Sequence, residues 1–285
     1  SPDLIGAVLN YEMFKLIINS VNKSQISPEK GKKYIHELLD SQKPSYGTLS
    51  SNKYIRMPDS KNLILIMKDL VKLGAELDSE TLYIATSIQR QQPDEVIEVL
   101  LDWISDIDFE DINTSHQILK PFNFAAMYCG VTIMKKFLLA GAEINPDERF
   151  ENPLFSAVDS SNEDAVKFLL ESGANPNCRE VQEHSPIYGK SALHRAIDAT
   201  VMSDENTHNI VRILVEHGAD LNGLRRENGK LVTPLDQAIK HQNFHSQFNR
   251  TEGDINRQNM SRMTVELLKS SGAKKTVYKT SRTLE

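Results

Sequence analysis

The chain has 285 residues, of which 39% are hydrophobic and 25% charged, a balance typical of a folded protein rather than a disordered or fibrous one. Its formal net charge is −6, and a surface of that sign repels phosphate backbones, which argues against a nucleic-acid partner. The two cysteines are too few for a disulfide framework, and no apolar run approaches the ~18 residues that a membrane span requires.

Apolar helical segments that end in Gly-Ala recur along the chain. The pairs lie at Gly74-Ala75, Gly141-Ala142, Gly173-Ala174, Gly218-Ala219 and Gly272-Ala273. The third pair follows the second by 32 residues, and the second follows the first by 67, about twice that interval. One unit without its glycine is therefore expected between them, with a helix at Val96–Trp103. The later intervals are longer because loops absorb insertions at a small entropic cost.

A second motif marks the start of the first helix of each unit. Its clearest copies are Asn152–Ala157, Ser191–Ala196 and Thr233–Ala238, and weaker copies lie at Lys120–Ala126 and Glu80–Ala85. Thr or Ser caps a helix, Pro suits its first turn, and the small Ala lets the second helix approach closely. The glycine after the second helix is expected to adopt the left-handed conformation that ends it.

The second helices carry apolar stripes that are too wide for one helix pair to bury. In the segment 164–170 the stripe consists of Ala165, Val166, Phe168, Leu169 and Leu170. Neighbouring pairs must cover it, so the sequence predicts helix pairs stacked in a row.

These features resemble the ankyrin-repeat family, whose repeats have a period of ~33 residues and a helix start of the form Thr-Pro-Leu-His-x-Ala-Ala. The resemblance implies an all-α solenoid of about seven helix-turn-helix units with short β-turn fingers. It covers residues 78–275 as five repeats, of which the last two hold insertions: Ser79–Asp111, Ile112–Asn145, Pro146–Asn177, Cys178–Asn222 and Gly223–Lys275.

Residues 1–77 are expected to hold degenerate repeats of the same kind. Tyr34–Leu39 and Leu63–Gly74 resemble the two helices of one unit with an inserted loop between them, and Leu4–Val21 resembles a capping unit. Residues 276–285 form a C-terminal tail.

The resemblance implies a scaffold or adaptor that binds a partner protein on the concave surface formed by the fingers and first helices. The positions that the consensus leaves free are the expected partner-binding residues: Gln117, Met127, Tyr128, Glu148, Arg149, Glu151, Asp159, Tyr188, Lys190, Asp198, Lys240 and His241. Aromatic and Arg side chains among polar neighbours suit binding hot spots, so Tyr128, Arg149 and Tyr188 are the expected anchors.

Degenerate repeats with polar insertions are also similar to the ankyrin-repeat effectors that intracellular bacteria inject into host cells. We expect a monomeric cytoplasmic protein, or one delivered into a host cytoplasm if it is such an effector. Two alternatives remain open. The chain could be the targeting or regulatory portion of a larger enzyme, or it could hold a hydrolase or transferase site built from inserted loops, with Cys129, His241 or His245 and an aspartate.

The motifs that imitate catalytic or metal sites have structural explanations that we favour. Gly223–Lys230 resembles a phosphate-binding loop, but it has five intervening residues rather than four and lacks the following Ser or Thr, so a finger turn is expected. His241 and His245 have the spacing of a zinc-protease helix, but Gln242 stands where the general base must be. We expect no catalysis, no metal and no cofactor.

Three further residues have a packing role in this interpretation. Cys129 follows a first helix and is expected to be a core or turn thiol. His194 occupies the consensus histidine position, for which the resemblance implies a structural hydrogen bond to neighbouring backbone. Trp103 stands where the missing Gly-Ala turn would lie, as a plug of a minor core or, alternatively, as a partner anchor.

Overall fold

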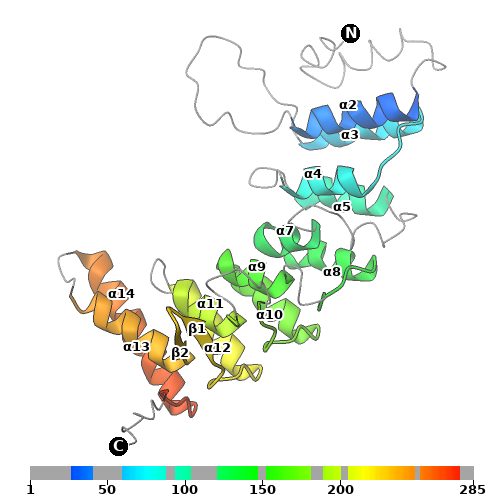
Figure 1. The fold of residues 1–285 in the computed structure, drawn as a ribbon. Helices are drawn as coiled ribbons and strands as arrows, with labels where there is room; N and C mark the ends of the chain where they lie inside the picture. Colours follow the sequence, from blue (N-terminus) through cyan, green and yellow to red (C-terminus); the bar gives the residue numbers. More distant parts are fainter. Residues whose placement is uncertain are drawn as a thin grey trace, which may run out of the picture. The chain divides into compact units, whose positions relative to one another are not determined.

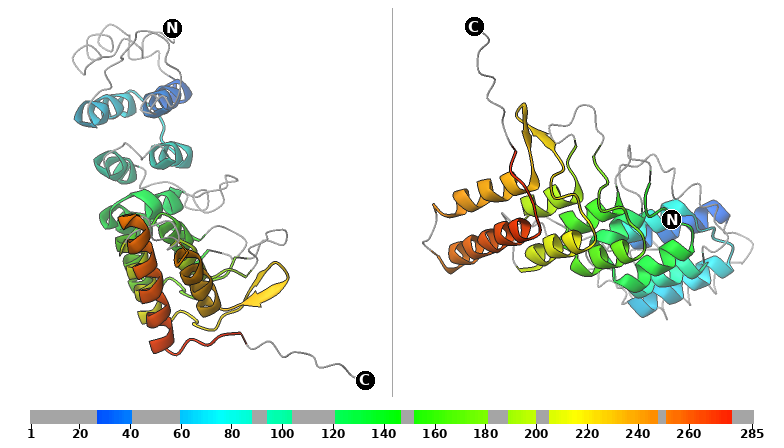
Figure 2. Two further views of the ribbon diagram at one scale, coloured as in Figure 1. Left: turned by 90° about the vertical axis from the view of Figure 1, so that its left-hand side faces the viewer. Right: turned by 90° about the horizontal axis from the view of Figure 1, so that it is seen from below.

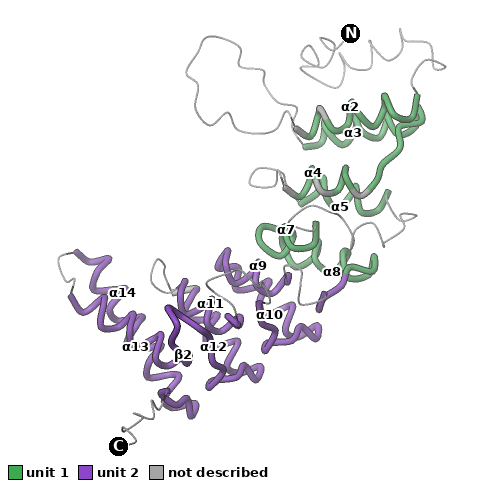
Figure 3. The backbone as a smooth tube through the Cα atoms, in the orientation of Figure 1, with its two compact units in different colours: residues 1–142 green, residues 143–285 purple. Residues whose placement is uncertain are grey.

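The computed structural model describes residues 27–40, 60–87, 94–103, 121–146, 152–180, 189–199, 205–247 and 251–276. The chain divides into two compact units, residues 1–142 and 143–285 (Figure 3). Across the described segments, twelve helices follow one another in pairs, and one two-stranded sheet lies between the fifth and the sixth pair (Figure 1). None of these helices is long and apolar enough to cross a membrane.

Unit 1 contains three helix pairs. They are α2 (Pro28–Asp40) with α3 (Ser60–Lys72), α4 (Ser79–Ser87) with α5 (Asp94–Trp103), and α7 (Pro121–Tyr128) with α8 (Val131–Leu139). The first helices contact one another in chain order, and so do the second helices, which gives two layers. The helices predicted at 34–39, 63–74 and 96–103 are confirmed, including the unit that lacks its glycine.

Unit 2 repeats this arrangement. Its pairs are α9 (Pro153–Asp159) with α10 (Glu163–Glu171), α11 (Ala192–Ala199) with α12 (Glu205–Glu216), and α13 (Pro234–His245) with α14 (Glu252–Ser270). Strands β1 (Arg225–Glu227) and β2 (Lys230–Val232) form an antiparallel hairpin that projects to one side of the helices (Figure 2). This hairpin is the finger that precedes α13.

The predicted all-α stack of helix pairs is thus confirmed. The described residues hold six pairs of the about seven expected, and the capping unit at 4–21 lies outside them. The division into residues 1–77, 78–275 and 276–285 stays a prediction.

The ends of the second helices have the predicted geometry. The five glycines that follow them, at positions 74, 141, 173, 218 and 272, have φ between +84° and +99°, where a side chain would be strained. The amide of the next alanine donates to the carbonyl five residues back, as from Ala174 to Leu169 at 2.9 Å. Each of these five second helices therefore ends in a left-handed turn that directs the chain toward the next finger.

The starts of the first helices are capped as their sequences suggest. Thr233 accepts a hydrogen bond from the amide of Asp236, whose carboxylate accepts one from the Thr233 amide, and Pro234 occupies the first turn. Asn152 caps α9 in the same place, with Pro153 after it. In α10 the stripe residues Ala165, Val166, Leu169 and Leu170 are at most 7% exposed, because α9 and α12 cover them.

Asparagines that follow the second helices join successive turns of unit 2. Asn145 donates to the Gly173 carbonyl (2.9 Å) and accepts from the Asn175 amide (2.8 Å). One repeat later, Asn177 donates to the Gly218 carbonyl (3.1 Å) and accepts from the Asp220 amide (2.6 Å). Each side chain therefore satisfies one acceptor and one donor of the next turn, which fixes the spacing of the repeats.

Replacing Asn177 with Ala should lower the unfolding free energy by about 1–2 kcal/mol, because two hydrogen bonds between repeats are lost. Urea denaturation followed by circular dichroism measures this. Asn259→Ala is the matched control, since Asn259 is exposed in α14 and its side chain makes no hydrogen bond to another described residue. An equal effect of the two substitutions would show that the asparagine contacts do not stabilise the stack.

Candidate functional site

The first helices and the finger of unit 2 carry two neighbouring groups of ionisable side chains, one around Asp198 and one around Arg195, which we call together the charge network. Its members come from α9, α11, α13, the hairpin and the segment between α10 and α11: Asp159, Glu180, Lys190, Arg195, Asp198, Arg225, Glu227, Lys240 and His241.

Asp198, near the end of α11, lies at the centre of the charge network. Its carboxylate forms an ion pair with Lys190, accepts a hydrogen bond from the Gln237 amide, and lies 3.5 Å from Nη1 of Arg225. Nε2 of His241 is 3.7 Å away. A single carboxylate therefore connects α11 to both α13 and the finger.

The hairpin extends the network toward α13. Arg225 is only 6% exposed, and its Nη2 lies 3.1 Å from Oε2 of Glu227. Nζ of Lys240 donates to the other carboxylate oxygen of Glu227 at 2.8 Å, and this hydrogen bond holds the pKa of Glu227 below its ordinary value. A buried guanidinium needs such partners, because an unpaired charge in this position would be costly.

Arg195 is the centre of the second group, whose Asp159 interacts electrostatically with Lys190 and Asp198 of the first group. Its guanidinium forms an ion pair with Asp159, lies 3.2 Å from Glu180, and sits over the ring of Phe155 at 4.6 Å from the ring centre. These contacts join residues from three successive segments of the stack. The charge network thus spans all three repeats of unit 2.

His241 is held by the preceding first helix. Its Nδ1 donates to the carbonyl of Ile197 at 3.1 Å, and burial lowers the pKa of the ring. His245, one turn later, is 5% exposed, and burial lowers its pKa as well. In the described segments these two residues belong to no group of three or more ligands with metal-binding spacing.

The structure brings together five of the predicted partner-binding residues. Asp159, Lys190, Asp198, Lys240 and His241 all belong to the charge network, although each was identified only as a position that the consensus leaves free.

The remaining predicted residues do not join this group. Met127 and Tyr128 end α7 in unit 1, where both are half-buried and the Tyr128 ring stacks on Phe124 at 6.5 Å. The others lie outside the described residues: Gln117, Glu148, Arg149, Glu151 and Tyr188.

Sequence reasoning missed four members of the network, namely Glu180, Arg195, Arg225 and Glu227. One signal was available for the last two: Asn228-Gly229 is a dipeptide typical of a tight hairpin turn, and Arg225 and Glu227, two residues apart before it, point to the same face of a strand.

The segment 223–230 that imitates a phosphate-binding loop is a finger, as predicted. Arg225 pairs with Val232 and Glu227 with Lys230, and the turn between them consists of Asn228 (φ +48°) and Gly229 (φ +78°). Two positive φ values are characteristic of the hairpin turn that matches the twist of the strands.

The other singled-out residues of unit 1 occupy packing positions. Cys129 is 4% exposed, and its amide donates to the Ala125 carbonyl at the end of α7, which supports the core interpretation over that of an accessible nucleophile. Trp103 is the last residue of α5 and is half-buried.

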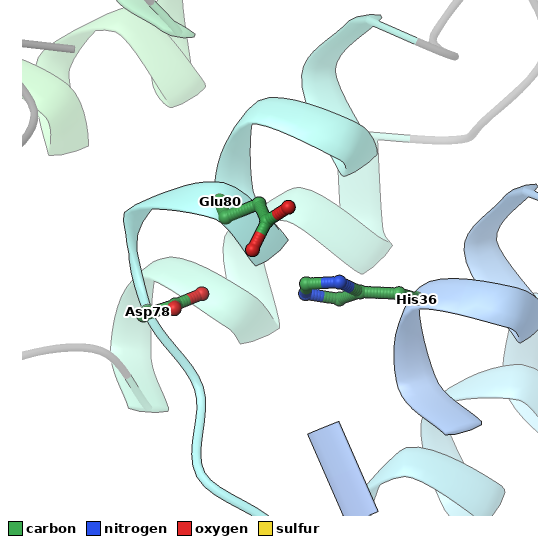
Figure 4. A group of neighbouring side chains, drawn as sticks. All are labelled: His36, Asp78 and Glu80. Carbon is green, nitrogen blue, oxygen red and sulfur yellow. The ribbon is translucent and has the colours of Figure 1, made fainter. Parts of the chain in front are cut away.

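Within the described segments one group has the spacing of metal ligands: His36 of α2 points toward Asp78 and Glu80 at the start of α4 (Figure 4). Lys32 already pairs with both carboxylates, at 3.1 Å from Glu80, and the hydrogen bond to Asp78 raises the pKa of Lys32. The ammonium group therefore supplies the positive charge that a metal would bring.

The same group also caps α4. Oδ1 of Asp78 accepts from the Thr81 amide at 3.1 Å, and Thr81 Oγ1 lies 2.9 Å from Nε2 of His36. The arrangement is explained as an ion pair and a helix cap that link two neighbouring first helices of unit 1.

His194 makes the structural hydrogen bonds expected of its position. The amide and hydroxyl of Ser191 both lie within hydrogen-bond distance of Nδ1, at 3.4 and 2.8 Å, so the ring proton belongs on Nε2. Burial, together with the nearby Arg225 charge, lowers the pKa of His194 to about 4, whereas the backbone of Val232 acts in the opposite direction. The ring is therefore neutral at neutral pH.

Acidification should destabilise the protein through His194. Between pH 6.5 and about 4 the unfolded chain binds a proton at this ring and the folded chain does not, so the unfolding free energy falls as the pH falls through this window. The expected loss is about 3 kcal/mol, and His241 and His245 act in the same direction. Urea denaturation at several pH values measures it, with His194→Gln as the comparison. A wild-type pH dependence no steeper than that of the variant would contradict this assignment.

Comparison with known proteins agrees with this arrangement. A family model for ankyrin repeats (3 copies) matches residues 82–180 and 122–222. The crystal structure of an ankyrin repeat domain from Acinetobacter baumannii AYE is similar to the chain, with a TM-score of 0.53 and 20% sequence identity. The match covers 74% of this chain and 93% of that domain, and at this identity the likeness concerns the fold alone. Among curated proteins none matches the chain.

The matched region extends from residue 82, inside α4, to residue 222, beyond the end of α12, and the same Gly-Ala ends and helix starts continue to α14 outside it. The chain therefore belongs to the ankyrin-repeat family.

Proposed function

We propose that the chain is an adaptor that binds a partner protein through the charge network of unit 2. Ankyrin repeats are generally protein–protein interaction modules. The observation that carries the proposal is that five residues expected to bind a partner lie in two neighbouring ion-paired groups that extend from α9 to α13, with Asp159 and Lys240 exposed at the two ends. Side chains held in place by neighbours lose little further conformational freedom on binding, which favours recognition.

The main competing explanation is that the charge network has only a structural role. The exposed fractions of its side chains distinguish this explanation from partner binding. The central side chains are mostly covered, with Arg225 at 6% and Lys190 at 12% exposed, so their charges serve the fold. The outer side chains reach solvent, with Asp159 at 45% and Lys240 at 62% exposed. Exposed ion pairs contribute only about 0–1 kcal/mol to stability, so the outer ends are available for a partner at little cost to the fold.

The double substitution Asp159→Asn and Lys240→Gln should weaken partner binding at least about tenfold and change the unfolding free energy by less than about 1 kcal/mol. It leaves the net charge unchanged. Partners captured by the wild-type chain from lysate are identified by mass spectrometry, purified, and titrated against each variant.

The matched control is Arg212→Gln with Glu216→Gln, which removes an exposed ion pair from the second-helix layer. Equal affinities of the two double variants would contradict the proposed surface. A large loss of stability in the first variant would favour the structural explanation.

The centre of the network should behave differently. Asp198→Asn removes the charge that faces Lys190 and the buried Arg225, so the unfolding free energy should fall by about 2 kcal/mol. Thermal and urea denaturation measure this loss. If the loss is no larger than that of the double variant Asp159→Asn, Lys240→Gln, the covered side chains of the network do not contribute more to stability than the exposed ones.

The interpretations as a bacterial effector, as a portion of a larger enzyme, and as a monomeric cytoplasmic protein stay predictions.

A further inference from the structure

The finger hairpin has two different faces. Because side chains alternate along a strand, Arg225 and Glu227 share the face that joins the charge network. Leu224 and Arg226 lie on the other face, and Arg226 pairs in register with Leu231 of β2. Leu224 and Leu231 are each 43% exposed, and Arg226 is exposed between them. We call these three residues the outer finger face.

The finger carries positive charge that no other described residue neutralises through an ion pair. In the charge network each cation lies against a carboxylate, as Lys240 and Arg225 do against Glu227. Arg226 on the outer finger face and Lys230 beside the turn have no ion-pair partner among the described residues. A cationic projection on a chain with net charge −6 is a local feature that attracts carboxylates.

The finger is also held firmly in place. Nη1 of Arg179 donates to the carbonyls of Leu224 (2.7 Å) and Gly189 (3.1 Å), and the Asn228-Gly229 turn closes the other end. A guanidinium flanked by two exposed leucines on a fixed strand pair resembles the Arg-centred, partly apolar composition of interface hot spots.

We propose that the outer finger face docks an acidic segment of the partner protein. A carboxylate of that segment binds the guanidinium of Arg226, and its apolar side chains pack on Leu224 and Leu231, with Lys230 adding attraction beside the turn. This inference rests on the proposed function and names the chemistry of the partner for one part of the surface.

The test uses the full chain and three fluorescein-labelled synthetic peptides of equal length, read by fluorescence anisotropy. The first peptide combines glutamate, leucine and serine, the second has lysine in place of glutamate, and the third has serine in place of leucine. The first should bind at least about tenfold more tightly than the other two and should weaken as salt is added. Equal binding of the lysine peptide would overturn the proposal.

Variants assign the binding to the outer finger face. Arg226→Gln should weaken binding of the first peptide about tenfold, and Leu224→Ser with Leu231→Ser should do the same, because each removes one kind of contact. Arg262→Gln, the same change at an exposed position of α14, should leave the affinity unchanged. Circular dichroism confirms that each variant is folded. Equal affinities of Arg226→Gln and Arg262→Gln would overturn the proposal.

Two further measurements separate this inference from its alternatives. Sedimentation velocity of the chain alone should show no dimer that depends on Arg226. A wild-type dimer that is lost in Arg226→Gln would mean that the outer finger face binds a second copy of the chain instead of an acidic segment. With a captured partner, loss of binding in Asp159→Asn, Lys240→Gln but not in Arg226→Gln would refute the docking of an acidic segment and retain the adaptor function. Loss in neither variant would refute both.

Discussion

The fold depends on one constraint: a pair of short amphipathic helices cannot bury its own apolar stripe. The stripe of α10 is covered on one side by its partner α9 and on the other by α12 of the next pair. Each pair therefore gains its core only when a neighbour is present, which makes stability a property of adjacent repeats. The glycines with positive φ after the second helices, together with Asn145 and Asn177, serve this requirement, because they fix the spacing between successive helix pairs.

That constraint divides the surface into positions with different freedom. The apolar stripes are committed to neighbours, whereas the outward sides of α9, α11 and α13 need only be compatible with water. In unit 2 those positions hold ions that pair across repeats, such as Arg195 with Asp159. Pairing lets a dense set of charges coexist next to the core without an uncompensated buried charge. These ion-paired residues of α9, α11 and α13 thereby also align the first helices.

The helices and their ends could be predicted from the sequence, whereas the charge network could not. The helix ends followed from Gly-Ala, the starts from capping residues such as Thr233, and even the glycine-less helix α5 followed from the spacing of its neighbours. These features depend on residues a few positions apart. The ion pairs Arg195–Asp159 and Arg225–Asp198 join residues separated by about one repeat, and loops of unequal length precede them. The repeat period therefore does not predict which side chains of two neighbouring repeats contact each other.

Pairing within the chain also decides what a partner can gain from each charge. A ligand group that approaches Glu227 competes with Lys240 and Arg225, so contact there exchanges one ion pair for another and yields mainly geometric specificity. Contact with Arg226 displaces no described carboxylate, so the attraction adds to affinity. In the proposed adaptor, the network would therefore reject partners of the wrong charge pattern, and the outer finger face would hold the partner that fits.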